Sequence, residues 1–267
     1  MNLDLLFYAA TLTGNQAMWE AARTHAITTR RTHIRDDSSV VHLVVFDPET
    51  GEIQQCLTNQ GYADDSCWTR GQAWAIAGFA ETYSWTKEDD FLETACDCAD
   101  YFLRRLPDSN IPPWDFDAVE RDPAAVQPPD TSAAMIASYG MLLLHKALRR
   151  MGSIERAMKY LNAAQRITVA VYGSHATFDD ATFGKLLLSV KSVEDPESAA
   201  FIETVARGAG GDTLLTGATI NNYEFAPRRW ANHGLVYADY YALAVKDLLL
   251  EMGGGSRSRV FDTSVRA

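Results

Sequence analysis

The stretch of residues 60–74, QGYADDSCWTRGQAW, contains the densest set of side chains that could bind and orient a polar ligand. The guanidinium of Arg70 can form two parallel hydrogen bonds with a carboxylate, which a lysine does less well. Trp68 and Trp74 offer flat apolar faces of the kind on which sugar rings stack. The amide of Gln60 can both donate and accept a hydrogen bond. These residue types at this spacing therefore fit a sugar-binding site.

The same stretch also has a purely structural interpretation. Trp74 would then belong to the core, Arg70 would pair with Asp64 or Asp65, and the loop would only cap a helix. Composition alone favours this interpretation, because aromatic residues at helix starts usually serve packing.

A second group of reactive side chains consists of Asp115 and Asp117 in the motif PWDFD, and of Asp130 further along. Carboxyl groups in different environments can divide the roles of general acid and general base. Asp130, however, directly precedes Thr131 at the start of an apolar-periodic segment, where an aspartate commonly caps a helix. Its position favours the capping role.

Metal and nucleotide chemistry find little support in the sequence. His42 stands alone in a predicted strand, and His25 and His145 have no partner at the spacing of a metal site. The chain has no P-loop, GxGxxG, GxSxG or HExxH motif, which argues against nucleotide-binding, serine-hydrolase and zinc-protease functions. We therefore expect no metal site.

Charge and hydropathy exclude further classes. A net charge of −11 argues against a nucleic-acid binder, and no apolar run is long enough to cross a bilayer. The first residues, MNLDLLFYAATLTG, lack a basic start and carry Asp4, so they predict an amphipathic helix and not a signal peptide. The four cysteines fit reduced structural thiols. We expect a cytoplasmic protein without nucleic-acid or membrane partners.

Three pairs of amphipathic helices are predicted to position these residues. They span residues 2–30 with a turn at 13–15, 69–106 with a turn near 85–86, and 131–171 with a turn at 152–153. Thr86 is expected to be the N-cap of the second helix of its pair. Repeated helical hairpins with long aromatic and acidic loops favour a closed α/α toroid over an open solenoid.

A single β-hairpin interrupts this helical pattern. The run Val40–Phe46 predicts a strand, DPETG predicts a turn, and a second strand is expected over Ile53–Leu57. Residues 174–216 are less regular, a last helix begins near Gly234, and Gly253–Gly255 end it. The sequence thus predicts one all-α domain over residues 1–252 and a disordered tail over 253–267.

Seven stretches, in order along the chain, resemble the unsaturated glucuronyl hydrolases (glycoside hydrolase family 88). They are MNLDLLFYAA, HLVVFDPETG, QGYADDSCW, WTRGQAWAIAGFAETY, PWDFD, PDTSAAMIAS and GLVYADYYALA. The combination of W-x-RGQAW with PWDFD favours this family over the sibling unsaturated rhamnogalacturonyl hydrolases. The resemblance implies an (α/α)6 barrel without metal or organic cofactor. It also implies substrates that are oligosaccharides with a 4,5-unsaturated glucuronyl residue at the non-reducing end.

The resemblance further implies roles for five residues. In the family an aspartic acid protonates the C4=C5 bond, water adds at C5, and the hemiketal that forms rearranges with loss of the glycosidic bond. His42 and Gln60 would help to hold the pyranose and the water. Arg70 would provide positive charge near the acidic sugar, and Trp68 and Trp74 would form pocket walls.

One departure from the family pattern concerns the catalytic acid. In the family this aspartate lies just upstream of the MNL stretch, whereas this chain begins at Met1. The resemblance therefore implies a barrel without its N-terminal hairpins and without its acid, with apolar edge helices left uncovered. Two hypotheses follow: an enzyme whose true N-terminus lies upstream, or a catalytically inactive carbohydrate-binding or vestigial paralogue. A third and less favoured hypothesis makes Asp115 or Asp130 the acid.

Overall fold

The computed structural model describes residues 2–119, 127–177 and 213–252. The first predicted helical hairpin is confirmed as α1 (Asn2–Thr13) and α2 (Gln16–His33). Gly14, at a φ of 65°, turns the chain between them. The side chain of Asn15 then accepts a hydrogen bond from the backbone N–H of Met18 and so caps α2.

The second hairpin consists of α3 (Thr69–Thr86) and α4 (Asp89–Arg105). The prediction that Thr86 caps the second helix is wrong. Its hydroxyl donates to the carbonyl of Thr82, so Thr86 ends α3, and Glu88 takes the N-cap position of α4 without a side-chain capping bond. Lys87, at a φ of 58°, closes α3, and the turn thus lies two residues later than expected.

The third hairpin is confirmed as α5 (Thr131–Arg150) and α6 (Ile154–His175), with its turn at Gly152 and Ser153. The last helix, α9 (Val236–Met252), begins two residues after Gly234, close to where the sequence places it. The expectations of an end at Gly253–Gly255, of a disordered tail over 253–267 and, for residues 178–212, of less regular structure concern residues outside the described ranges.

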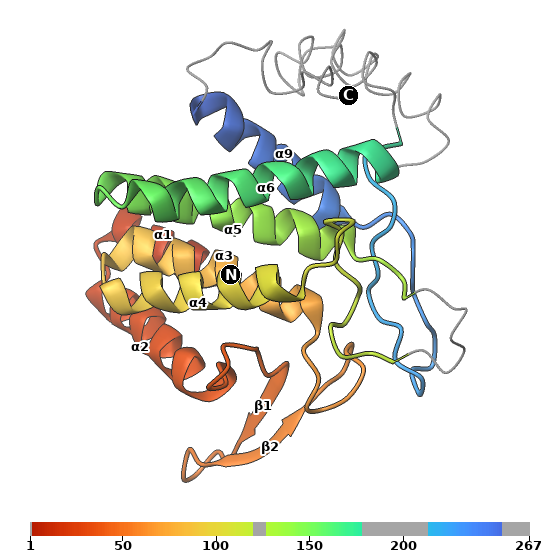
Figure 1. Ribbon diagram of the computed structural model, residues 1–267. Coiled ribbons are helices and arrows are strands. Elements are labelled where there is room, and N and C mark those ends of the chain that lie inside the picture. Colours follow the sequence, from red (N-terminus) through yellow and green to blue (C-terminus); the bar gives the residue numbers. More distant parts are fainter. Residues whose placement is uncertain (1, 120–126, 178–212, 253–267) are drawn as a thin grey trace, which may run out of the picture.

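The helices form an arc of hairpins, as expected for an all-α protein built like an α/α toroid (Figure 1). Helix α3 packs against α1 on one side and α5 on the other, and α5 continues the row to α9. Helices α2, α4 and α6 pack behind their hairpin partners. The start of α3, the end of α4 and the start of α5 all lie on one side of the molecule, at the helix ends where the long loops gather.

Among the described residues, α1 and α9 stand at the two ends of this row, and both expose large apolar side chains. Leu5 and Leu12 of α1 are 70% and 69% exposed, and Val236 and Tyr240 of α9 are 67% and 64% exposed. Helix α5, between two neighbours of the row and α6, is instead buried around most of its circumference. No helix in the described part of the chain is long and apolar enough to span a membrane.

The small sheet pairs β1 (Leu43–Phe46) with β2 (Ile53–Leu57) in an antiparallel hairpin. The second strand is confirmed, but the first begins three residues later than predicted. Val40 instead forms an isolated bridge with Ile34 at the end of α2, which turns the chain before the strand starts. His42 therefore lies before β1, at the point where the chain enters the hairpin.

Candidate functional site

A groove with a cavity volume of about 960 Å³ runs along the inner face of α3. Arg70, Trp74, Gly78 and Glu81 follow one another along its floor at spacings of four, four and three residues, which place them on one face of the helix. The first residues of α1 and the first turns of α9 also line it. The five predicted site residues, His42, Gln60, Trp68, Arg70 and Trp74, all line this groove.

The guanidinium of Arg70 lies at one end of the groove in a buried ion pair. Its Nη1 is 2.7 Å from Oδ2 of Asp130, and the two side chains are 2% and 0% exposed. The structural alternative, a pair with Asp64 or Asp65, is wrong. Asp64 accepts a hydrogen bond from the backbone N–H of Thr58 and so closes its own loop.

Arg70 also joins three separate segments of the chain. Its Nη1 donates to Ser132 Oγ and to the carbonyl of Thr219, and its Nη2 donates to Oε1 of Gln60 and to the carbonyl of Ile220. Sequence reasoning missed the two carbonyls, because a backbone acceptor has no side-chain signature. With these partners, Arg70 is an organising residue, and little of its guanidinium remains for a ligand.

Of the two roles that the sequence left open for Asp130, the structure supports the helix cap and not the free acid. Its Oδ1 accepts hydrogen bonds from the backbone N–H groups of Ser132 and Ala133, which confirms the predicted N-cap of α5. The same oxygen accepts from the hydroxyl of Ser132, and Oδ2 pairs with Arg70. Asp130 does not line the groove.

An aromatic stack connects Arg70 to His42. The guanidinium carbon lies 4.6 Å from the centroid of the Trp68 ring, and the imidazole of His42 stacks on the same indole at 4.1 Å with an interplanar angle of 24°. Trp68 is only 7% exposed. The indole therefore mainly holds its two neighbours in place, and its Nε1 has no hydrogen-bond partner among the described residues.

His42 is an uncharged imidazole at neutral pH. Burial and, to a smaller extent, the charge of Arg70 lower its pKa to about 4. Its Nδ1 lies 2.9 Å from Oγ1 of Thr58 and 3.3 Å from the backbone nitrogen of Asn59. The side chain can thus act as a hydrogen-bonding group in the groove without contributing charge.

Gln60 and Trp74 complete this end of the groove. Because Oε1 of Gln60 accepts from Arg70, the amide is oriented and its Nε2 is left to donate elsewhere. The ring of Trp74 makes edge contacts with Tyr237 and Tyr241 of α9, at 5.7 and 5.5 Å between centroids. Trp74 therefore forms an apolar wall that joins α3 to α9.

The carboxyl of Asp115 supports a loop and does not face the groove. It is 1% exposed and accepts hydrogen bonds from the backbone N–H groups of Tyr62 and Asp117 and from Ser66 Oγ. Burial raises its pKa, yet the group does not line the groove. Asp117 accepts from the backbone N–H of Cys67 and pairs with Arg105. The hypothesis of Asp115 or Asp130 as a substitute acid has no geometric support.

The other end of the groove contains a carboxyl that sequence reasoning missed. Glu81 is 9% exposed, and its Oε2 has no hydrogen-bond partner among the described residues. Burial raises its pKa to about 7, and the nearby carboxylate of Asp4 acts in the same direction. In the sequence, Glu81 resembles a solvated residue of an amphipathic helix, so no local pattern marks it.

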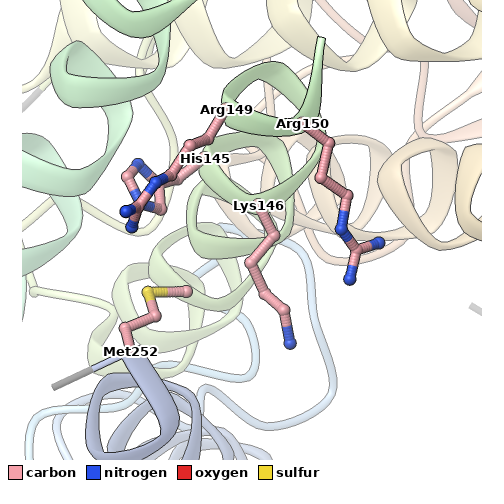
Figure 2. Close-up of a pocket in the computed structure, with 5 residues that line it drawn as sticks. All are labelled: His145, Lys146, Arg149, Arg150 and Met252. Carbon is pink, nitrogen blue, oxygen red and sulfur yellow. The ribbon is translucent and has the colours of Figure 1, made fainter. Parts of the chain in front are cut away.

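A smaller pocket of about 320 Å³ lies at the far end of α5, away from the Arg70 end (Figure 2). His145, Lys146, Arg149 and Arg150 line it together with Met252 of α9. Arg149 and Arg150 lie in the last turn of α5, where basic side chains complement the helix dipole, and Lys146 pairs with Glu251 of α9. The described residues contain no group of three side chains that could hold a metal ion.

Comparisons with known proteins place the chain in a family, although no family model matches it. The chain is 37% identical over 180 residues to the unsaturated glucuronyl hydrolase of Bacillus sp. (strain GL1), over 67% of this chain and 46% of that protein. It is 30% identical over 243 residues to the unsaturated chondroitin disaccharide hydrolase of Streptococcus pneumoniae (strain ATCC BAA-255 / R6), over 91% of this chain and 52% of that protein.

The fold agrees with these similarities. The crystal structure of the unsaturated glucuronyl hydrolase from Bacillus sp. GL1 matches with a TM-score of 0.73 at 29% identity, over 95% of this chain and 57% of that chain. The chain spans about half the length of the curated relatives that it matches. Similarity in sequence and in fold together show that this chain belongs to the family of the unsaturated glucuronyl hydrolases.

Proposed function

We propose that the groove binds the unsaturated glucuronyl residue of an oligosaccharide, and that the protein acts in removing this residue by hydrating its 4,5 double bond. The observation that carries the proposal is the preformed cluster of His42, Gln60 and Trp68. These side chains reach one end of the groove from three different positions. Arg70 holds Gln60 and Trp68, and the indole of Trp68 stacks on His42. Relatives named as unsaturated glucuronyl and chondroitin disaccharide hydrolases support the same activity.

The reaction needs one proton at carbon and one water molecule. A carboxylic acid gives its proton to C4, the oxygen of water bonds to C5, and the water returns a proton to the carboxylate. The hemiketal at C5 then opens to a ketone, and the glycosidic bond breaks in the rearrangement that follows. Because the acid must be protonated when the sugar arrives, the reaction requires a carboxyl whose pKa is raised toward neutrality.

The cluster is suited to hold such a sugar. The Nε2 of Gln60 can donate to a ring hydroxyl, and uncharged His42 can hydrogen-bond to the sugar or to the attacking water. The half-buried ring of Trp74 forms an apolar wall for the pyranose. Arg70 acts through Gln60 and Trp68, because Asp130 and two backbone carbonyls engage its guanidinium.

The carboxyl groups of the described residues favour a second candidate function, saccharide binding without turnover. Only Asp4 and Glu81 line the groove among those residues. Glu81 lies eleven residues beyond Arg70 on the same helix, which at about 1.5 Å of rise per residue separates them by roughly 16 Å. A sugar held by His42 and Gln60 would therefore lie out of reach of Glu81.

Two measurements on the same sample separate the two functions. The absorbance of an unsaturated chondroitin disaccharide near the unsaturated uronate band reports hydration, and titration calorimetry reports binding. Loss of absorbance that Gln60→Ala abolishes would establish the hydrolase. Saturable binding that Gln60→Ala weakens, with constant absorbance, would establish the binding function.

Gln54→Ala provides the matched control, since Gln54 is an exposed glutamine of β2 whose side chain donates to Asp47 on the hairpin turn. It should leave both signals unchanged. Absence of both binding and hydration in the parent protein would refute the proposal.

A further inference from the structure

We propose that Thr58 is a positioning residue that holds the imidazole of His42 as the Nε2–H tautomer, so that a hydrogen-bond donor faces the groove. The use of this donor for a sugar rests on the proposed function, whereas the tautomer itself does not. Thr58 does not line the groove, so its influence on a ligand would pass through His42.

The direction of two hydrogen bonds fixes the tautomer. The backbone nitrogen of Asn59 lies 3.3 Å from Nδ1 of His42, and a backbone N–H can only donate. Nδ1 must then be an acceptor, which leaves the single proton of the neutral imidazole on Nε2. The hydroxyl of Thr58, 2.9 Å from the same Nδ1, must donate its own proton to it.

A third hydrogen bond orients the hydroxyl of Thr58. The backbone N–H of Gly61 donates to Oγ1 of Thr58 at 2.9 Å, so this oxygen accepts from Gly61 and is free to donate to His42. The close approach requires a glycine. A Cβ at position 61 would lie 2.6 Å from Oγ1 of Thr58 and 3.0 Å from Oδ2 of Asp115. The loop is thus shaped around this hydroxyl.

The stack on Trp68 fixes the plane of the ring, and the contacts at Nδ1 fix its rotation within that plane. Nε2 has no hydrogen-bond partner among the residues that the structure describes, and His42 lines the groove. The ring therefore presents an N–H that is ready to bind an oxygen atom, such as a sugar hydroxyl. Because the imidazole is neutral, this donor is the same across the whole neutral pH range.

The test is a two-bond 15N–1H correlation spectrum of the full chain at pH 7, without any ligand. His42→Gln identifies the signals of His42 by their disappearance among the six histidines of the sequence. In the parent protein, Nδ1 should have the shift of an unprotonated nitrogen and Nε2 that of a protonated one. Thr58→Val should move both shifts toward each other, because one of the two donors to Nδ1 is lost, and Thr58→Ser should restore the parental pattern.

Affinity for the unsaturated chondroitin disaccharide provides the second readout. Thr58→Val should raise Kd about five-fold, in the range of one ordinary hydrogen bond, and Thr58→Ser should not. The control is Thr50→Val, which removes an exposed hydroxyl on the turn of the β-hairpin. A parental His42 with its proton on Nδ1, or a Thr58→Val variant with parental shifts, would overturn the inference. If the parent protein shows the predicted nitrogen shifts but binds no disaccharide, the proposed function is refuted and the assignment of the tautomer still holds.

Discussion

The two ends of the groove differ in how many hydrogen-bond partners their buried polar groups have. At the Arg70 end, a buried cation has five hydrogen-bond partners: a carboxylate, a hydroxyl, an amide and two carbonyls. At the other end, the buried carboxyl of Glu81 has an oxygen without a partner among the described residues, and its pKa is raised to about 7. The polar groups at one end are already oriented, whereas the carboxyl at the other end resists ionisation and has one oxygen without a partner among the described residues.

This difference bears on function. A binding site for a polar ligand benefits from groups that are already oriented, because the ligand then does not have to order them. The Arg70 end meets this condition for Gln60, Trp68 and His42. The Glu81 end instead loses stability whenever its carboxyl ionises, since burial disfavours the charged form.

The largest effect is expected from Asp130→Ala at the satisfied end. The change leaves Arg70 as a buried cation without its partner and also removes the cap of α5. Breaking a buried ion pair from one side lowers the free energy of unfolding by about 3–5 kcal/mol, as urea denaturation would measure.

The control is Asp90→Ala, which removes the 73%-exposed carboxyl from its pair with Arg30 and should cost less than about 1 kcal/mol. Equal losses in the two variants would show that the cluster around Arg70 is not the rigid element described here.

A smaller effect of opposite sign is expected from Glu81→Gln. The pKa of Glu81 in the folded protein, about 7, lies above its ordinary value of 4.5. The folded protein holds the proton of Glu81 more tightly than the unfolded chain does. The stability that this carboxyl contributes is therefore fully present below about pH 4.5 and is lost as the pH rises through 7. The variant should match the parent near pH 4 and exceed its free energy of unfolding by about 1–3 kcal/mol at pH 8.

Thermal or urea unfolding at a series of pH values measures this difference. Glu20→Gln, at an exposed position of α2, is the control and should follow the parental pH profile. Parallel profiles for the parent and Glu81→Gln would contradict the raised pKa and would remove the contrast between the two ends.

The smallest effect is expected at the basic pocket of α5. Arg149→Ala removes an exposed side chain that complements the helix dipole, and it should lower the free energy of unfolding by no more than about 0.3–1 kcal/mol at low salt. The difference should shrink in 1 M salt, because the interaction is screened. A loss that does not respond to salt would show that Arg149 has a packing role.

Much of the fold was predictable from local signals. The helical hairpins follow from apolar periodicity, and Asp130 was recognised as a cap from the two residues after it. The errors came from competition between neighbouring elements. Thr86 bonds back into α3 and so cannot begin α4, and the bridge between Val40 and Ile34 delays the first strand.

The candidate site was only partly predictable. Its five residues line one groove, yet the partner of Arg70 lies 60 positions further along the chain, and two acceptors are backbone carbonyls about 150 positions away. Local spacing suggested Asp64 or Asp65 instead. The burial of Glu81 depends on how α1 and α9 approach α3, which no local pattern records.

The most direct test of the central claim is a crystal structure of the protein with an unsaturated chondroitin disaccharide. We expect the unsaturated sugar beside His42 and Gln60, with Arg70 still paired to Asp130 at the present distance of 2.7 Å. A disaccharide bound at the Glu81 end, or an Arg70 that has left Asp130 to bind the uronate, would contradict it.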